Sequence, residues 1–109
     1  ENFNINHLVF NSDGLIPTIA QEKSTNEILM MAYSNKNSIE MTVKTKKAHF
    51  WSRSKKKLWL KGETSGNKLN ITNIYTDCDS DALIYEVELE GIGACHTGKK
   101  SCFYKKLEL

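Results

Sequence analysis

Three cysteines and three aspartates lie within 26 residues of the C-terminal half, and they constrain this chain more than any other feature. Cys78 stands inside the run Asp77-Cys78-Asp79-Ser80-Asp81, and Cys95 and Cys102 enclose a polar segment. An odd number of cysteines fits disulfide bonding poorly and fits metal ligation or reduced thiols better. We therefore expect a protein of the reducing cytoplasm.

These two kinds of side chain suit different metals. Thiolates suit a borderline-soft metal such as zinc, whereas clustered carboxylates suit magnesium. Zinc held by three protein ligands keeps a fourth position open for water, which is typical of a catalytic site. The pattern therefore predicts a hydrolase with two metals. His96, next to Cys95, is then a further ligand or a general acid or base, and an ordinary surface histidine is the alternative.

The aspartates can be arranged in two ways. In an extended strand the three carboxylates would lie on one face about 6–7 Å apart, with Cys78 on the opposite face. A turn would instead gather the carboxylates, and a solvated strand edge is the alternative that needs no metal. A calcium-binding EF-hand loop is excluded, because Ala82 stands where its sharp turn needs glycine.

The apolar pattern predicts an α+β fold for residues 1–109, a single domain built mostly of β-strands in a sheet or roll with one main helix. Asn35 is expected to cap a helix that runs to about Lys46. No apolar run approaches the ~20 residues of a membrane span, so we expect no membrane partner. Strands are expected at residues 16–20, 28–33, 48–52, 58–60, 71–76 and 82–89, with a last short strand beginning at Phe103-Tyr104.

The net charge of +2 conceals a segregation of charge along the chain. Residues 44–61 hold eight of the fifteen basic residues and no acid, and residues 77–90 hold six of the thirteen acids and no base. The two runs are either solvated faces or the anion-binding and cation-binding walls of one site. Phe50, Trp51 and Trp59 interleave the basic run, which alone would suggest stacking on nucleic acid.

The segment from Gly62 to Gly66 combines glycines with hydroxyl groups, which suits a loop that holds phosphate. It matches neither a P-loop nor a dinucleotide-binding fingerprint. Its basic neighbours, which include lysines 55–57, make phosphate binding the favoured interpretation. The candidate substrate contacts are Arg53, Lys61, Thr64, Ser65 and Gly66.

Four motifs in register carry a family resemblance. They are Trp51-Ser52-Arg53-Ser54 with Leu58-Trp59, Lys61-Gly62-Glu63-Thr64-Ser65-Gly66, Asp77-Cys78-Asp79-Ser80-Asp81-Ala82-Leu83, and Cys95-His96-Thr97-Gly98 ending in Ser101-Cys102-Phe103-Tyr104. In order and spacing, over roughly residues 10–105, the chain resembles the phosphoribosyl-AMP cyclohydrolases of histidine biosynthesis. Two positions depart from the commonest form: Lys55 replaces a frequent arginine, and Leu60 stands where a polar or basic residue is common.

The resemblance implies an enzyme that hydrolyses the N1–C6 bond of the adenine ring in 1-(5-phosphoribosyl)-AMP, a nucleotide with two phosphates. It also implies zinc and magnesium as cofactors, and an intertwined homodimer whose zinc ligands come from both subunits. Carried over by motif, the magnesium ligands are Asp77, Asp79 and Asp81, and the zinc ligands are Cys78, Cys95 and Cys102. We expect His96 to be the catalytic residue that moves a proton to the departing N1.

A zinc-stabilised nucleic-acid-binding module is the alternative. It would explain the basic run with its aromatic residues and the cysteines, but it would leave the aspartates without a purpose. We therefore expect a small-molecule substrate and no nucleic acid.

Overall fold

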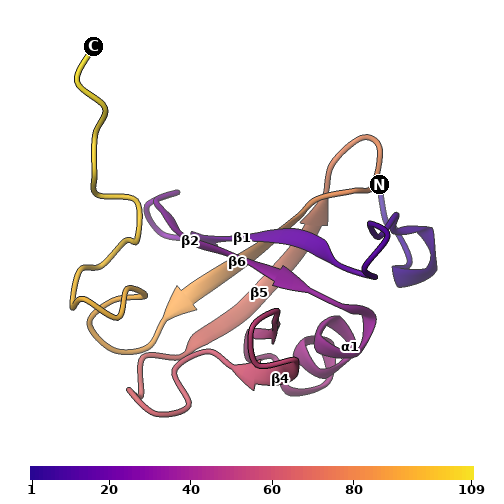
Figure 1. Cartoon of the computed structure of the whole chain (residues 1–109), viewed down its shortest axis with the longest axis horizontal. Coiled ribbons are helices and arrows are strands. Elements are labelled where there is room, and N and C mark those ends of the chain that lie inside the picture. The colour runs from indigo at the N-terminus through magenta and orange to yellow at the C-terminus, as the bar shows by residue number, and fades with distance from the viewer.

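Six strands form one curled sheet in the computed structural model, which describes residues 1–109 (Figure 1). One α-helix, α1 (Lys36–Thr45), and a short 3-10 helix, η1 (Ile5–His7), complete the regular structure, and the α+β expectation is confirmed. The six strands expected before residue 90 are all present, with ends shifted by at most two residues. They are β1 (Ile16–Glu22), β2 (Ile28–Ser34), β3 (His49–Ser52), β4 (Lys57–Leu60), β5 (Leu69–Thr76) and β6 (Leu83–Leu89).

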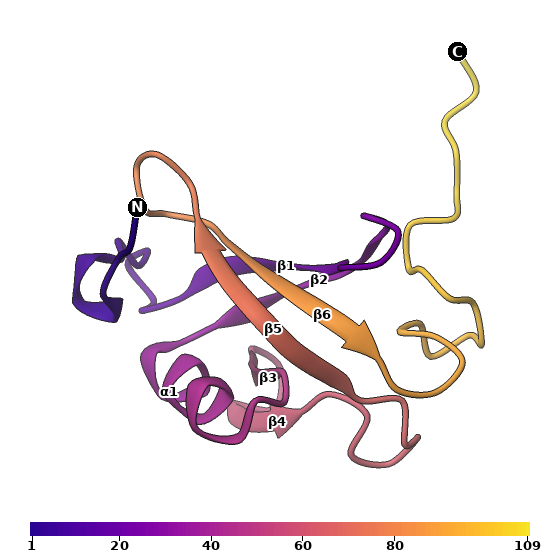
Figure 2. The same ribbon diagram turned by 180° about the vertical axis from the view of Figure 1, so that it is seen from behind.

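The strand order is β4-β3-β2-β1-β6-β5, and every pair of neighbours is antiparallel except β1 and β6. These two strands run in parallel, from Thr18 opposite Leu83 to Glu22 opposite Val87. Seen from behind, the β5–β6 hairpin crosses the molecule beside β1 (Figure 2). The end of β6 therefore lies beside the turn that joins β1 to β2, and the β5–β6 turn lies at the opposite end of the sheet.

The core lies between the inner face of the sheet and α1, which packs against β2, β3 and β4. Phe50 lies at its centre, with ring centroids 5.2 Å from Trp59 and 5.5 Å from Tyr85. Ile39 of α1 is buried against the same cluster. Burying each such large apolar side chain contributes roughly 1.5–3 kcal/mol, so this cluster fixes the sheet on which the site residues stand.

The ends of α1 follow from side-chain chemistry. The Asn35 side chain accepts a hydrogen bond from the Ser38 amide at 2.8 Å, and the Ser38 hydroxyl oxygen accepts one from the Asn35 amide at 2.9 Å. Lys46 ends the helix in the left-handed conformation with φ 62°. The expected cap and end of the helix are thereby confirmed. No helix in the chain combines the length and the apolar character needed to span a membrane.

The expected last strand at Phe103-Tyr104 is wrong. The Cys102 amide donates to the Leu29 carbonyl of β2 at 2.7 Å, but the Phe103 amide donates to the Ser101 hydroxyl at 3.0 Å. Pairing with β2 therefore stops after one hydrogen bond. Phe103 is 63% exposed, and residues 103–109 extend away from the sheet (Figure 1).

Loss of the helix cap should be measurable. Asn35→Ala removes the side chain that accepts from the Ser38 amide, and we expect the free energy of unfolding to fall by about 1 kcal/mol. Asn37→Ala makes the same chemical change at an exposed position inside α1, where alanine favours the helix, and it should not destabilise. Denaturant unfolding at one protein concentration compares them, and equal stability of the two variants would contradict the cap.

Candidate functional site

The β5–β6 turn gathers the three aspartates. The carboxylates of Asp77, Asp79 and Asp81 each place an oxygen within 4.8 Å of the others, and all three side chains are exposed. The Asp77 carboxylate accepts hydrogen bonds from the amides of Asp81 at 3.0 Å and Ala82 at 3.3 Å. Of the two arrangements open from the sequence, the structure contains the turn. Three converging carboxylates are a donor set that fits a hard cation such as magnesium.

Crowding of these carboxylates changes their proton affinities. Hydrogen bonding and repulsion from Asp79 and Asp77 raise the pKa of Asp81 to about 6. Partial loss of hydration acts to raise the pKa of Asp77, but the hydrogen bonds that its carboxylate accepts outweigh this effect and lower it. The cluster therefore retains a proton at a pH where isolated carboxyl groups are ionised, and a bound cation would displace that proton.

The segment that carries Cys95 and Cys102 folds back on itself after β6. The Ala94 amide donates to the Lys100 carbonyl at 2.9 Å, and the Cys95 amide donates to the Lys99 carbonyl at 3.2 Å. Gly93 is required at this close approach, because a Cβ there would lie 2.4 Å from the Lys99 carbonyl oxygen. This fold-back brings the two cysteines to the same region.

Ion pairs tie the cysteine segment to the turn between β1 and β2. The Lys100 ammonium lies 2.6 Å from the Glu22 carboxylate and 3.2 Å from the Glu27 carboxylate. The Ser101 hydroxyl donates to the Ile28 carbonyl at 2.6 Å. These contacts, together with the bond from the Cys102 amide to β2, fix the segment beside the end of β6.

The two thiols of this segment interact. A contact of 3.0 Å between the Cys95 sulfur and the Thr97 hydroxyl lowers the pKa of Cys95, and the Cys102 thiol adds to the effect. Burial raises the pKa of Cys102, as does its hydrogen bond to Cys95. The pair therefore favours a thiolate on Cys95, and a thiolate is the form of cysteine that binds metal.

Cys78 lies far from the other two cysteines. It is exposed in the β5–β6 turn, whereas Cys95 and Cys102 follow the other end of β6 (Figure 1). The seven residues of β6 span roughly 20 Å at about 3.3 Å per residue. One chain thus unites two of the three expected zinc ligands, and the third stands with the aspartates at the opposite end of the strand.

His96 faces the basic strands rather than the aspartates. It lines a pocket together with Thr64 and Ser65 of the loop that follows β4. The pocket contains both a histidine and hydroxyl donors, next to cationic side chains that suit a phosphate. The other lining residues are Ser52, Lys55, Lys57, Trp59, Leu60, Gly62 and Glu63.

Arg53 lines a second, neighbouring pocket that shares Ser52 and Trp59 with the first. Its guanidinium lies 4.1 Å from the centroid of the Tyr33 ring, and it forms no ion pair with any acid of the chain. A cation stacked on an aromatic ring keeps its N–H donors free. The Arg53 donors are thus available to an anion, and its contact with substrate stays a prediction.

Lys61 and Gly66 have other surroundings. The Lys61 ammonium donates to the Ala94 carbonyl, so this side chain is directed to the cysteine segment rather than to the pocket with His96. Gly66 belongs to the same turn as Thr64 and Ser65, with φ 80° and its amide bonded to the Gly62 carbonyl at 2.8 Å. It shapes the loop without lining the pocket.

Sequence reasoning missed two residues of this region. Glu63 lines the pocket with His96, and Thr97 contacts the Cys95 sulfur. A signal for Thr97 was present, since a hydroxyl two residues after a cysteine is within reach of its sulfur. Glu63 carried no separate signal, because an acid in a glycine-rich turn is common on solvated loops.

Comparison with known proteins gives the family of this chain. The family model described as phosphoribosyl-AMP cyclohydrolase matches residues 30–104. The chain belongs to the phosphoribosyl-AMP cyclohydrolase family. It is 57% identical over 101 residues to the phosphoribosyl-AMP cyclohydrolase of Archaeoglobus fulgidus, with 93% of both chains covered. It is 52% identical to that of Methanoregula boonei, with 93% of this chain and 81% of the relative covered.

A longer relative matches as well. The histidine biosynthesis bifunctional protein HisIE of Aquifex aeolicus is 50% identical over 101 residues, which cover 93% of this chain and 49% of that protein. The chain thus spans about half the length of this bifunctional relative. Membership of the phosphoribosyl-AMP cyclohydrolase family decides for a hydrolytic enzyme over the nucleic-acid-binding module that was the alternative.

The aspartate cluster of this cyclohydrolase family member should titrate abnormally. In metal-free protein we expect the Asp81 carboxyl to titrate near pH 6, and Asp79→Asn should lower that value towards 3.8. The folded chain holds this proton more tightly than the unfolded chain. The contribution of Asp81 to the free energy of unfolding should therefore fall as pH rises from about 4 to 6. Carbon-13 NMR of the carboxyl groups measures the titration.

Asp13→Asn serves as the control, because Asp13 lies in the turn before β1, outside the cluster. It should leave the titration of Asp81 unchanged. An Asp81 carboxyl that titrates near pH 4 in the wild-type protein would contradict the crowding.

Proposed function

We propose that this enzyme opens the adenine ring of 1-(5-phosphoribosyl)-AMP by hydrolysis of the N1–C6 bond, with zinc and magnesium as cofactors. Water adds its oxygen to C6, the N1–C6 bond breaks, and a proton passes to N1, while the exocyclic amino group stays on C6. Family membership supports the substrate, and the observation that carries the cofactors is the donor set of thiols and clustered carboxylates.

The cysteines are the proposed zinc ligands. Cys95 and Cys102 interact through their thiols and stand on a segment that is fixed by hydrogen bonds and ion pairs. A third thiolate, from Cys78, would complete a set of three soft ligands. When bound, zinc supplies an activated water as the nucleophile at neutral pH.

His96 is the proposed proton donor to N1. It follows Cys95 directly and lines the pocket with Thr64 and Ser65. A histidine in this position can hold the proton that the departing nitrogen needs, since imidazole exchanges protons near neutral pH. The adenine ring would then lie between His96 and the cysteines.

The basic residues are proposed to bind the two phosphates. Lys55, Lys57, Thr64 and Ser65 line the pocket with His96, and Arg53 lines the next pocket with its donors free. Two separate groups of donors suit a substrate with two phosphates. The carboxylates of the aspartate turn are the proposed magnesium ligands.

The separation of the cysteines supports a homodimer. Cys78 precedes β6, and Cys95 and Cys102 follow it, so the length of the strand, roughly 20 Å, separates them within one chain. Cys78 is therefore better placed to bind zinc together with the cysteines of another chain. We propose that Cys95 and Cys102 of one subunit and Cys78 of the partner subunit hold each zinc, which gives two equivalent sites in a symmetric dimer. Three unpaired cysteines also support the reducing cytoplasm as the compartment.

An absorbance assay tests the reaction. With phosphoribosyl-AMP, zinc and magnesium we expect ring opening, whereas AMP, which lacks the N1 substituent that activates C6, should not react. Chelation of the metals should abolish turnover, and their return should restore it. Turnover that is unchanged in metal-free protein would overturn the cofactor proposal.

Mixed dimers test the shared zinc site. Cys78→Ser and Cys102→Ser should each abolish tight zinc binding and activity, because each removes one of three protein ligands. When the two variants are unfolded and refolded together, a heterodimer can rebuild one intact site, so some zinc binding and turnover should return. Each variant refolded alone is the control. If the heterodimer forms but neither binds zinc nor turns over substrate, the zinc site is not shared between subunits.

Arg53 should affect substrate binding more than chemistry. Arg53→Lys removes the planar fork that suits a bidentate phosphate contact, and loss of a charged hydrogen bond costs roughly 1.5–3 kcal/mol. We therefore expect KM to rise about 10-fold or more while kcat changes little. Steady-state kinetics measure the effect, with Lys36→Arg on the exposed start of α1 as the control. Wild-type KM in Arg53→Lys would show that Arg53 does not touch the substrate.

A further inference from the structure

One buried carboxylate has no part in the proposed chemistry. Glu22 is the only acid among the buried residues of the chain, at 9% exposure. Alternate residues of β1 face the core, and Glu22 is the last of these positions, opposite the fully buried Val87 of β6. A carboxylate on a core face loses hydration, which costs free energy unless other groups bind it.

The group that binds Glu22 comes from the cysteine segment. The Glu22 carboxylate lies 2.6 Å from the Lys100 ammonium and accepts a hydrogen bond from the Thr25 hydroxyl at 2.7 Å. These two bonds, that of Lys100 first, lower the pKa of Glu22 and so favour its ionised form. Glu27 is a second and more exposed partner of Lys100.

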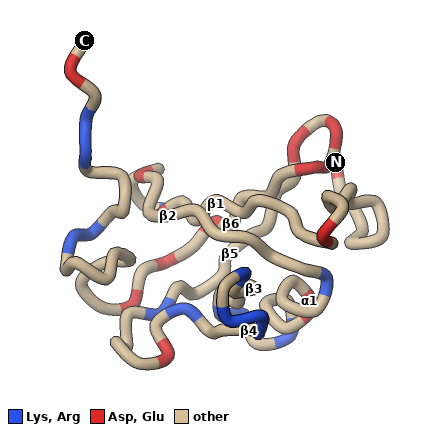
Figure 3. Tube along the Cα trace, viewed as in Figure 1, with Lys and Arg blue, Asp and Glu red and all other residues tan.

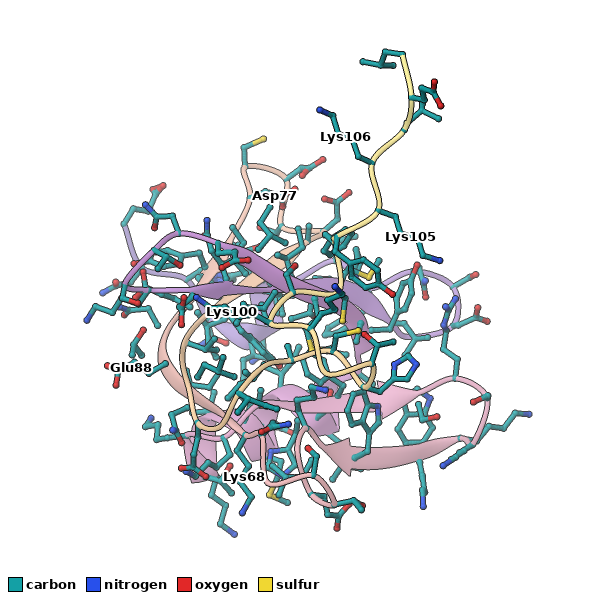
Figure 4. All side chains as sticks on the ribbon, turned by 90° about the vertical axis from the view of Figure 1, so that its left-hand side faces the viewer. Lys68, Asp77, Glu88, Lys100, Lys105 and Lys106 are labelled. Carbon is teal, nitrogen blue, oxygen red and sulfur yellow. The ribbon has the colours of Figure 1, made fainter.

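The figures show the same arrangement. The basic stretch after β6 and the acidic residues of the β1–β2 turn lie at one end of the sheet (Figure 3). Lys100 lies beside the sheet, whereas Lys105 and Lys106 project from the tail (Figure 4). Lys100 is thus the lysine after β6 that joins the cysteine segment to the sheet.

β2 is irregular where the cysteine segment reaches it. Leu29 has no partner on β1, so β2 bulges at this residue. The Leu29 carbonyl accepts a hydrogen bond from the Cys102 amide at 2.7 Å. The neighbouring Ile28 carbonyl accepts one from the Ser101 hydroxyl at 2.6 Å. Adjacent carbonyls of a regular antiparallel strand point to opposite edges, and a bulge bends the strand locally. Here both carbonyls at the bulge bind the cysteine segment.

Two lysines hold the two ends of this segment. The Lys61 ammonium donates to the Ala94 carbonyl, next to Cys95, and Lys100 binds Glu22 two residues before Cys102. Residues 96–100, between these anchors, are exposed. The relative placement of the two thiols therefore depends on the anchors rather than on apolar packing of the residues between them.

We propose that Glu22 and Lys100 are positioning residues, which hold Cys102 where it can bind a soft metal ion together with Cys95. A buried ion pair is weak evidence for stability, because the loss of hydration offsets much of the attraction. Its effect here is on placement, since it fixes Lys100 and thereby brings Cys102 to the bulge of β2. This inference rests on the proposed zinc site, and neither residue is a ligand or a substrate contact.

Zinc affinity of the folded protein tests the proposal. Glu22→Gln keeps the size of the side chain and loses its charge, and Lys100→Met removes the ammonium. Each should raise the zinc dissociation constant about 10-fold or more, as is typical when a group that orients metal ligands is lost. Lys100→Arg keeps the charge and should bind zinc like the wild type. The double variant should lose no more than Lys100→Met, because the two residues act as one unit.

Glu86→Gln is the matched control. The Glu86 carboxylate also accepts two hydrogen bonds, from Thr72 at 2.8 Å and from Asn73 at 3.0 Å. It pairs with Gln21, so it faces the opposite side of the sheet from Glu22. It should leave zinc affinity unchanged. Competition with a chromophoric chelator measures the affinity, absorbance of the cobalt-loaded protein reports thiolate ligation, and circular dichroism checks the fold.

The outcomes separate this role from a structural one and from the zinc site itself. An ion pair that only stabilises the fold would lower the free energy of unfolding in Glu22→Gln and Lys100→Met but leave their zinc affinity at the wild-type value. That result would overturn the positioning role and leave the zinc site in place.

A wild type that binds no zinc would overturn the proposed cofactor. Hydrogen exchange of the Cys102 amide in metal-free protein would then decide the positioning role alone. We expect faster exchange in both variants, because the bond to Leu29 opens more often when Lys100 is released. Protection of this amide at the wild-type level in both variants would overturn the role.

Discussion

The parallel pairing of β6 with β1 is the constraint on which both halves of the site depend. It places the end of β6 beside the β1–β2 turn, where Glu22 and Glu27 meet Lys100 and where β2 accepts the Cys102 amide. It also leaves the β5–β6 turn, with the aspartates and Cys78, at the far end of the sheet. The positions of the candidate metal-binding side chains therefore follow from the sheet topology.

Local structure was largely predictable from the sequence because it depends on neighbours. Alternation of apolar residues predicted the strands, and Asn35 predicted the start of α1. The exception at Phe103-Tyr104 has a local cause as well. The apolar pair predicts a strand, but the Phe103 amide donates to the Ser101 hydroxyl instead of to β2. Only the hydrogen bond from the Cys102 amide to β2 remains. Whether a nearby hydroxyl will compete with a neighbouring strand for a backbone amide is difficult to predict from a sequence.

The assembly of the candidate site was less predictable because it depends on contacts between distant segments. Residue types and spacing indicated the metals, yet the sequence left open whether the aspartates form a strand or a turn. The left-handed conformation of Ser80 and the amides bonded to Asp77 decide for the turn. The direction of Lys61 towards Ala94 has a similar origin, since that contact joins residues 33 positions apart.

The length of β6 has a consequence for the proposed dimer. Cys78 and the aspartates precede the first residue of β6, and the other two cysteines follow its last, so in the proposed dimer one strand would contribute to both sites. A strand held in the middle of a sheet is stiff along its axis. In the proposed dimer, β6 would therefore be a rigid link between the two sites.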